Sequence, residues 1–157
     1  AVGPRQPDWV AAGFACYAER LPTHCALVLE EIPLAPRNKG LPAARARAQE
    51  GQRLLARLPD DRLIVALDER GESWATQALA KHLQDWLAAG RDLTLLVGGP
   101  DGLDAACLQR AHRHWSLSAL TLPHGLVRVI VAEQIYRAWS ILQHHPYHRD
   151  QRDQRAD

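Results

Sequence analysis

Hydrophobic and polar positions divide the chain into short apolar runs that alternate with longer amphipathic segments. The runs at 62–68, 92–99 and 115–120 are nearly continuous, which is typical of strands buried in a parallel sheet. A run at 25–32 has the length and branched content of a further strand, and Val2 reads as the end of a truncated first strand. The segments between these runs predict helices at about 8–21, 43–58, 74–89, 103–113 and 126–142.

This alternation predicts an α/β protein with a parallel sheet and helices on both faces. The 157 residues contain no internal repeat and no linker, so we expect one domain. The chain does not begin with Met and opens on the end of a strand, so we expect the first strand to start before Ala1. Ligands of such sheets bind where loops leave the carboxyl ends of the strands, here after Leu67, Val97 and Leu120.

Composition narrows the class of protein. Hydrophobic residues make up 46% of the chain and charged residues 24%, without a run of eighteen apolar residues or a signal sequence, so we expect a soluble, cytoplasmic protein. A net charge of +1 excludes a strongly basic protein that coats nucleic acid, but not a local patch that reads a shaped RNA. Cys16, Cys25 and Cys107 form no CxxC pair, which favours buried thiols over disulfides or a zinc site.

Two loops carry candidate chemistry. Residues 33–42 contain three prolines, a glycine and two cations, and are a candidate for ligand contact. The stretch "GGPDG" (98–102) joins a strand to a helix, where backbone N–H groups suit an anion. Its glycine spacing is not the dinucleotide fingerprint, which argues against a nicotinamide oxidoreductase, and no Lys-Ser/Thr pair of a P-loop follows. Without further support, an ordinary tight turn explains this stretch.

The last predicted helix is apolar on more than one face. Packing on the sheet accounts for part of this surface, and a second copy of the chain is the simplest use for the rest, with Tyr136 and Trp139 as anchors. A helix wrapped entirely in its own core is the alternative. Glu133 precedes Arg137 by four residues, which predicts an ion pair within the helix.

The tail "HHPYHRD" (144–150) gathers histidines, Tyr147 and Arg149. No carboxylate or thiol is spaced with these histidines as a fourth ligand, so we expect no metal site. A solvated terminus explains such a run. Tyr beside His and Arg is also the combination that stacks on a base and pairs with phosphate.

Several motifs together resemble the RlmH family of ribosomal RNA large-subunit methyltransferases. The similarity covers essentially the whole chain and is most specific in its last third. Asp101 stands where glutamate is common in the family, and Gly125 where many members have proline. The stretches that carry the resemblance are "PDWV" (7–10), "ALDERGESW" (66–74), "LLVGGPDGL" (95–103), "WSLSALTLPHGLVRVIVAEQIYRAWSI" (115–141) and "HPYHRD" (145–150).

The resemblance implies a SPOUT-class fold with a C-terminal trefoil knot, acting as a homodimer. It implies transfer of a methyl group from S-adenosylmethionine to N3 of a pseudouridine in helix 69, the intersubunit-bridge helix of 23S rRNA, within assembled 70S ribosomes. It implies neither a metal nor a membrane. A SPOUT methyltransferase of another RNA and a non-catalytic ribosome-binding module are the alternatives.

The resemblance also implies roles for particular residues. The tail, 143–157, would reach the active site of the partner subunit, with Arg149, Tyr147 and His148 as catalytic residues. Arg128 and Arg149 would bind RNA. At Gly99 the missing side chain would let the backbone approach the ligand closely. The cofactor would be held by Leu67, Gly99, Ser118, Ala119, Leu120, Thr121, Leu122 and Pro123.

Overall fold

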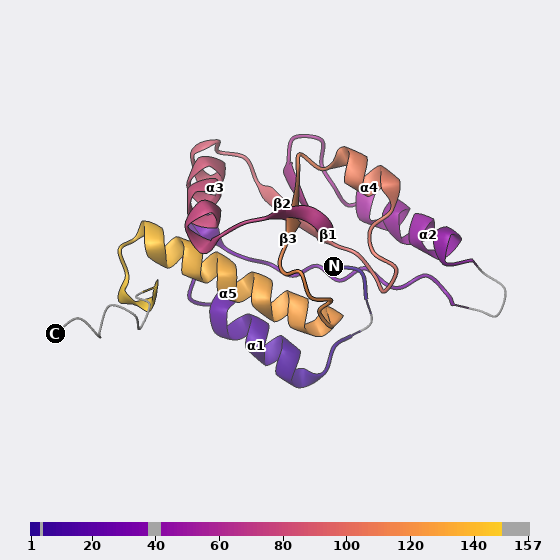
Figure 1. Ribbon diagram of the computed structural model, residues 1–157, viewed down its shortest axis with the longest axis horizontal. Helices are drawn as coiled ribbons and strands as arrows, with labels where there is room; N and C mark the ends of the chain where they lie inside the picture. Colours follow the sequence, from indigo (N-terminus) through magenta and orange to yellow (C-terminus); the bar gives the residue numbers. More distant parts are fainter. Residues whose placement is uncertain (4, 38–41, 149–157) are drawn as a thin grey trace.

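The computed structural model describes residues 1–3, 5–37 and 42–148 (Figure 1). The described residues form five helices and three strands, and from residue 43 onward four helices alternate with the three strands in the predicted order. Short 3-10 turns cover Thr23–Cys25 and Pro146–His148. The elements are α1 (Asp8–Ala18), α2 (Ala43–Leu55), β1 (Leu63–Ser73), α3 (Thr76–Ala88), β2 (Leu93–Val97), α4 (Ala105–Arg110), β3 (Arg113–Ser116) and α5 (His124–Leu142).

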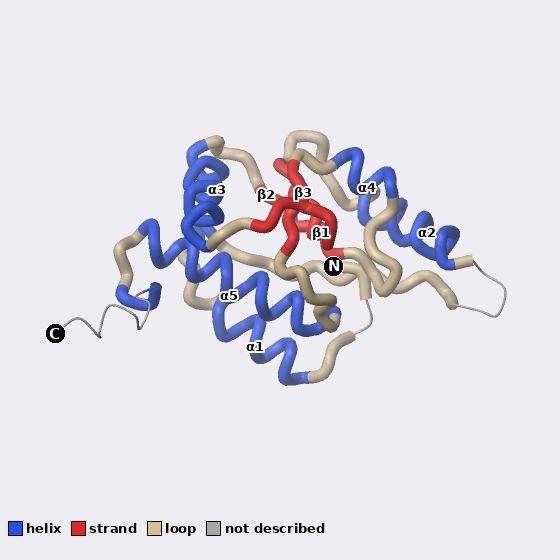
Figure 2. Tube along the Cα trace, in the orientation of Figure 1, coloured by secondary structure: helices blue, strands red, loops and turns tan. Residues whose placement is uncertain are grey.

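The three strands form a parallel sheet in the order β2-β1-β3. Successive side chains of β1 point to opposite faces: Val65 joins a core cluster with residues of α3 and α5, whereas Ile64 and Ala66 join a second cluster with Leu54 of α2 and Cys107 of α4. Figure 2 shows helices on both sides of the three strands. The predicted α/β class, with a parallel sheet and helices on both faces, is therefore confirmed.

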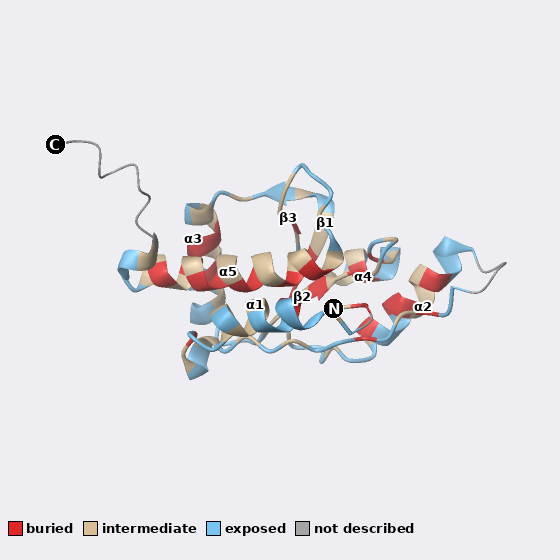
Figure 3. Cartoon of the chain, turned by 90° about the horizontal axis from the view of Figure 1, so that it is seen from below, coloured by how far each residue is buried: buried red, intermediate tan, exposed pale blue. Residues whose placement is uncertain are grey.

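Burial follows this layering (Figure 3). Helix α5 packs against both α1 and α3 and carries a row of buried residues along most of its length, whereas α1 buries only Val10. Of the three cysteines, all free thiols, Cys107 is buried while Cys16 is exposed. Burial raises the pKa of the Cys107 thiol to about 11. The expectation of buried thiols therefore holds for Cys107 and is wrong for Cys16.

The predicted strand at 25–32 is not formed. Only Ile32 makes a bridge, to Val2, which also donates from its backbone nitrogen to the Val97 carbonyl at 2.9 Å. The preceding residues run extended but have no neighbouring strand to bond with, and Val28 is 84% exposed. An apolar run forms a strand only when a partner backbone lies beside it, which explains the difference.

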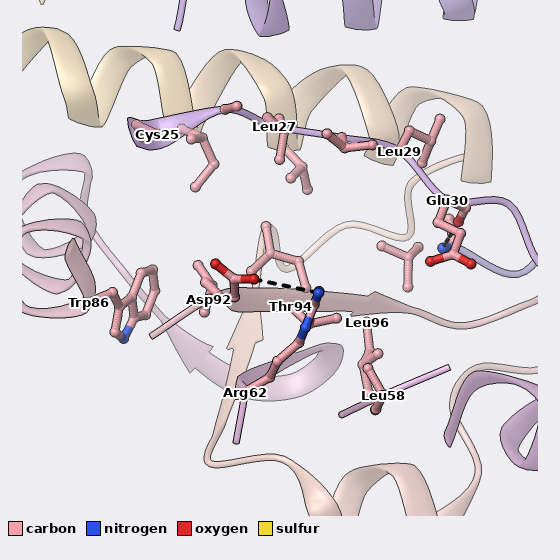
Figure 4. A pocket seen from close by; sticks show the side chains of 18 of the residues that line it. Cys25, Leu27, Leu29, Glu30, Leu58, Arg62, Trp86, Asp92, Thr94 and Leu96 are labelled. Atoms are coloured by element: carbon pink, nitrogen blue, oxygen red, sulfur yellow. Dashed lines mark hydrogen bonds and ion pairs between the residues drawn. The ribbon is translucent and has the colours of Figure 1, made fainter. Parts of the chain in front are cut away.

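A cavity of about 630 Å³ separates this extended segment from β2. Figure 4 shows Leu27 and Leu29 along one side and Thr94 and Leu96 of β2 along the other. The Ala1 amine also lines the cavity and donates to the Glu30 carbonyl at 2.8 Å, and burial lowers its pKa to about 6. Strand β2 is at the edge of the sheet and the cavity runs along it as far as Ala1, so a further parallel strand would fit there.

We expect that an apolar strand of about six residues joined to Ala1 will fill this cavity and raise the melting temperature by about 5 °C or more. The added backbone would pair with β2 and with the 26–31 segment. The matched control carries a proline in the middle of the added strand, which removes a backbone donor. Equal melting temperatures for the extended, control and unextended chains would show that the cavity does not seat a strand.

Candidate functional site

The parallel register brings two loops to one edge of the sheet. Leu67 of β1 pairs with Val97 of β2 and with Trp115 of β3. The turn at 98–102 leaves β2 just beyond this level, and the loop at 117–123 leaves β3 there. The predicted cofactor residues are therefore gathered at the carboxyl edge, where parallel sheets bind ligands.

Strand β1 does not end at residue 68, where the sequence predicted its end. Both Leu67 and Glu72 pair with Trp115, so the intervening residues bulge out of the ladder. At Gly71 an added Cβ would lie 2.7 Å from the His114 carbonyl carbon, so glycine permits this close approach to β3. The returning chain then places Trp74 in a stack on Trp115, with ring centroids 5.3 Å apart. Gly71 was the sequence signal for this bulge.

The loop after β3 combines an exposed apolar side chain with free backbone groups. Strand β3 ends at Ser116, so the second half of the strand predicted at 115–120 is wrong. Ser118 shapes the loop, because its Oγ accepts from the Leu120 nitrogen at 2.9 Å and its carbonyl accepts from Ser116. Leu120 is 76% exposed, and Leu122 is half-buried.

The donor set of this loop fits S-adenosylmethionine. The backbone nitrogens of Ala119, Thr121 and Leu122 have no hydrogen-bond partner among the described residues. An adenine ring needs polar groups at its edge and apolar groups on its faces, and the free amides and the leucines of 118–123 offer both. The apolar character of a loop that also contains Pro and Thr is explained if the loop is a ligand wall.

The turn after β2 is closed by a hydrogen bond from the Gly102 nitrogen to the Gly99 carbonyl at 2.9 Å. Gly102 has a φ of +80°, which favours glycine. At Gly99 an added Cβ would lie 2.8 Å from Oε2 of Glu50 and 3.2 Å from Val2. The space beside Gly99 is therefore filled by Glu50 and Val2, so packing within the protein also requires a glycine here.

Arg128 is buried rather than exposed at the surface of the structure. Its side chain is 1% exposed and forms an ion pair with Glu31. Gly3 packs directly against it, because an added Cβ would lie 3.0 Å from its Nη2. Burial, and then the charge of Arg128, lower the pKa of the neighbouring His124. The expected contact of Arg128 with RNA does not fit this burial, since residues before α1 cover the guanidinium.

The tail docks on α5. The Tyr147 hydroxyl donates to Oε1 of Glu133 at 3.1 Å, and its ring meets Tyr136 edge-on at 4.8 Å. Burial, contact with Tyr17 and the charge of Glu133 raise the pKa of Tyr147, so its hydroxyl stays protonated near neutral pH. The His148 backbone ends the last 3-10 turn, and Arg149 lies outside the described residues.

Helix α5 separates the tail from the loop at 118–123. Figure 1 shows the loop before the first turn of α5 and the tail beyond its last turn. Tyr147 packs beside Glu133 and Tyr136. Glu133 is ten residues beyond Pro123, which corresponds to about 15 Å along a helix at 1.5 Å per residue. One chain therefore does not place its Tyr147 beside its own loop at 118–123.

Of the predictions made for residues of α5, the structure confirms one and contradicts another. The Glu133–Arg137 ion pair is confirmed, with Arg137 Nη2 2.6 Å from Oε1 of Glu133. Tyr136 is buried within the core of its own chain, so its expected role as an anchor for a second copy is wrong. Trp139 is half-buried, and its Nε1 has no partner in the described part of the chain.

Over the described ranges, no group of three or more His, Cys, Asp and Glu side chains is placed to hold a metal ion. No helix there has the length and apolar character needed to cross a membrane.

A protein-family model described as "Predicted SPOUT methyltransferase" matches residues 1–148. The chain belongs to the SPOUT methyltransferase family. It is 57% identical over 150 residues to ribosomal RNA large subunit methyltransferase H of Thioalkalivibrio sulfidiphilus, covering 96% of each chain. It is 59% identical to the protein of the same name from Alkalilimnicola ehrlichii, covering 94% of this chain and 95% of the relative.

The protein of this name from Hydrogenovibrio crunogenus is 52% identical over 149 residues. The resemblance to the RlmH family that the motifs indicated is therefore confirmed. The α/β architecture is consistent with the SPOUT fold. Members of the SPOUT family use S-adenosylmethionine, and the loop at 118–123 offers groups that suit it.

We expect Leu120→Asp to weaken S-adenosylmethionine binding about tenfold or more, because it places a charge on the apolar wall of the proposed site. The melting temperature should stay unchanged, since the side chain is largely exposed. Calorimetric titration of the variant measures the affinity. Val28→Asp makes the same change at an exposed position away from this edge and should bind as the unaltered chain does. Equal affinity for both variants would exclude Leu120 from the cofactor site.

Proposed function

We propose that this protein transfers a methyl group from S-adenosylmethionine to N3 of a pseudouridine in helix 69 of 23S rRNA, within assembled 70S ribosomes. Membership of the RlmH family supports a ribosomal RNA substrate. The observation that carries the proposal is the wall at 118–123, where an exposed leucine and unpaired backbone donors lie at the carboxyl edge of a parallel sheet. The protein is proposed to be cytoplasmic.

The whole chain, 1–157, is proposed to form one SPOUT domain with a C-terminal trefoil knot. Residues 143–157 form its tail. In this arrangement Leu67, Gly99 and the loop at 118–123 bind and orient the cofactor. When bound, S-adenosylmethionine supplies an electrophilic methyl group on its sulfonium. The remaining work of the protein is to hold the target base in line and to stabilise the charge that develops on N3.

The tail is proposed to supply these groups. N3 of a pseudouridine is a weak acid, so a cation beside the base favours its ionised form. Arg149 is the proposed cation and also an RNA contact, with His148 as a further catalytic group. Because its pKa is raised, the Tyr147 hydroxyl stays protonated and is not the group that accepts the proton of N3. While it donates to Glu133, its oxygen is left to accept a hydrogen bond that orients the base.

A homodimer completes this site. Tyr147 packs on α5 about 15 Å beyond the helix start, away from the cofactor loop of its own chain. In a twofold dimer, the tail of one subunit can approach the loop of the other, so each site uses two chains. Much of the surface of α5 is apolar and only half-buried, at Leu126, Val127, Val129, Ile130 and Trp139, which supports a partner there.

The proposed reaction is tested by incubating the protein with labelled S-adenosylmethionine and 70S ribosomes that lack the modification, followed by mapping of the product nucleotide. We expect label at N3 of the helix 69 pseudouridine on 70S particles. Free 50S and 30S subunits, incubated in parallel, should remain unlabelled. Label on another RNA would indicate a different substrate. Ribosome binding without label would indicate a binding module.

The shared site is tested by mixing two variants that are impaired in different halves of the site, at a cofactor concentration too low to saturate Leu120→Asp. A chain that ends after Gln143 should bind the cofactor but not methylate, whereas Leu120→Asp should retain a working tail. After subunit exchange, half of the dimers are mixed and each has one complete site, so we expect about one quarter of the unaltered activity. Each variant alone is the control. Activity of the shortened chain by itself would contradict a role for the tail.

A further inference from the structure

A buried carboxylate lies directly behind the turn at 98–102. Glu50 of α2 is 2% exposed, and its Oε1 accepts hydrogen bonds from the Ala35 nitrogen at 2.9 Å and from Arg37 Nη2 at 3.0 Å. Its other oxygen lies against Gly99, at the place where an added Cβ would be 2.8 Å away. Glu50 therefore touches both the loop that carries Arg37 and the turn after β2.

Arg37 connects these two parts a second time. Its Nη2 binds Glu50, and its Nη1 forms an ion pair with the carboxylate of Asp101, inside the turn. A guanidinium can hold two carboxylates at once because its donors form a rigid, planar fork, which a lysine lacks. Arg47 of α2 adds a contact to the same residue, donating to the Asp101 carbonyl at 3.4 Å.

This arrangement differs from an ordinary surface ion pair. The Glu50 end is buried, so loss of Arg37 would leave a carboxylate without its cation away from water. The Asp101 end is about one-third exposed and lies on a turn whose backbone belongs to the carboxyl edge of the sheet. A change in the position of the Glu50 side chain would therefore shift that turn as well.

We propose that Arg37, oriented by the buried Glu50, is a positioning residue that fixes the 98–102 turn through Asp101 and so sets the affinity for the cofactor. The proposal rests on the proposed function of this edge as the S-adenosylmethionine site. It assigns a role to the loop at 33–42, because Arg37 of this loop would act on the cofactor indirectly, through the turn. It also explains why α2 carries a charged residue at a core position.

The test compares Arg37→Ala and Asp101→Asn with the unaltered chain by calorimetric titration with S-adenosylmethionine and by methyl transfer to 70S ribosomes. We expect each change to weaken cofactor binding about tenfold, with little effect on kcat at saturating cofactor, because the turn positions the ligand without joining the reaction. The double variant should be no weaker than either single one, since both remove the same link. Asp101→Glu, which keeps the anion, should restore the affinity.

Arg57→Ala is the matched control, because it removes an exposed ion pair with Glu30 and lies two residues beyond the end of α2. It should leave cofactor affinity unchanged. A lower melting temperature with unchanged affinity in Arg37→Ala and Asp101→Asn would overturn the proposal and leave Arg37 a purely structural role. Failure of the unaltered chain to bind the cofactor would instead count against the proposed function, so the two outcomes are distinguishable.

Discussion

The pairing of β1 with a strand on each side is the constraint on which the rest of the molecule depends. Because both partners run parallel to β1 and meet it at Leu67, the turn after β2 and the loop after β3 leave the sheet at one edge. A shift of either strand by one residue would turn its side chains to the opposite face and separate the loops. The two core clusters on opposite faces of β1 hold this register.

Around this edge, glycines and buried charged residues together determine how closely the segments of the chain pack. Gly71 lets the second part of β1 approach β3, and Gly99 lets the turn rest on Glu50. At both positions protein atoms lie where a side chain would begin, so packing within the protein requires the glycines. Buried charged groups cost free energy unless they are paired, and Glu50 and Arg128 each have a partner of opposite charge, Arg37 and Glu31.

Helix α5 organises the other half of the molecule. One of its faces is covered by α1 and α3, its first turn follows the proposed cofactor loop, and its later turns hold Tyr147 through Glu133 and Tyr136. The length of the helix keeps these two features apart in one chain. This separation supports, on geometric grounds, a site that two chains share.

The sequence by itself determined the α/β class, most of the elements after residue 42, the Glu133–Arg137 pair and the family, because these depend on local periodicity and on motifs that are continuous in the chain. Tertiary structure decided the rest. The run at 25–32 is apolar, yet without a neighbouring backbone it is not a strand. Tyr136 and Arg128 are residue types that often make contacts at protein surfaces. In the structure, α1 and the tail cover Tyr136, and the N-terminal residues cover Arg128. The link from Glu50 through Arg37 to Asp101 joins positions far apart in sequence, and only the fold brings their charges together.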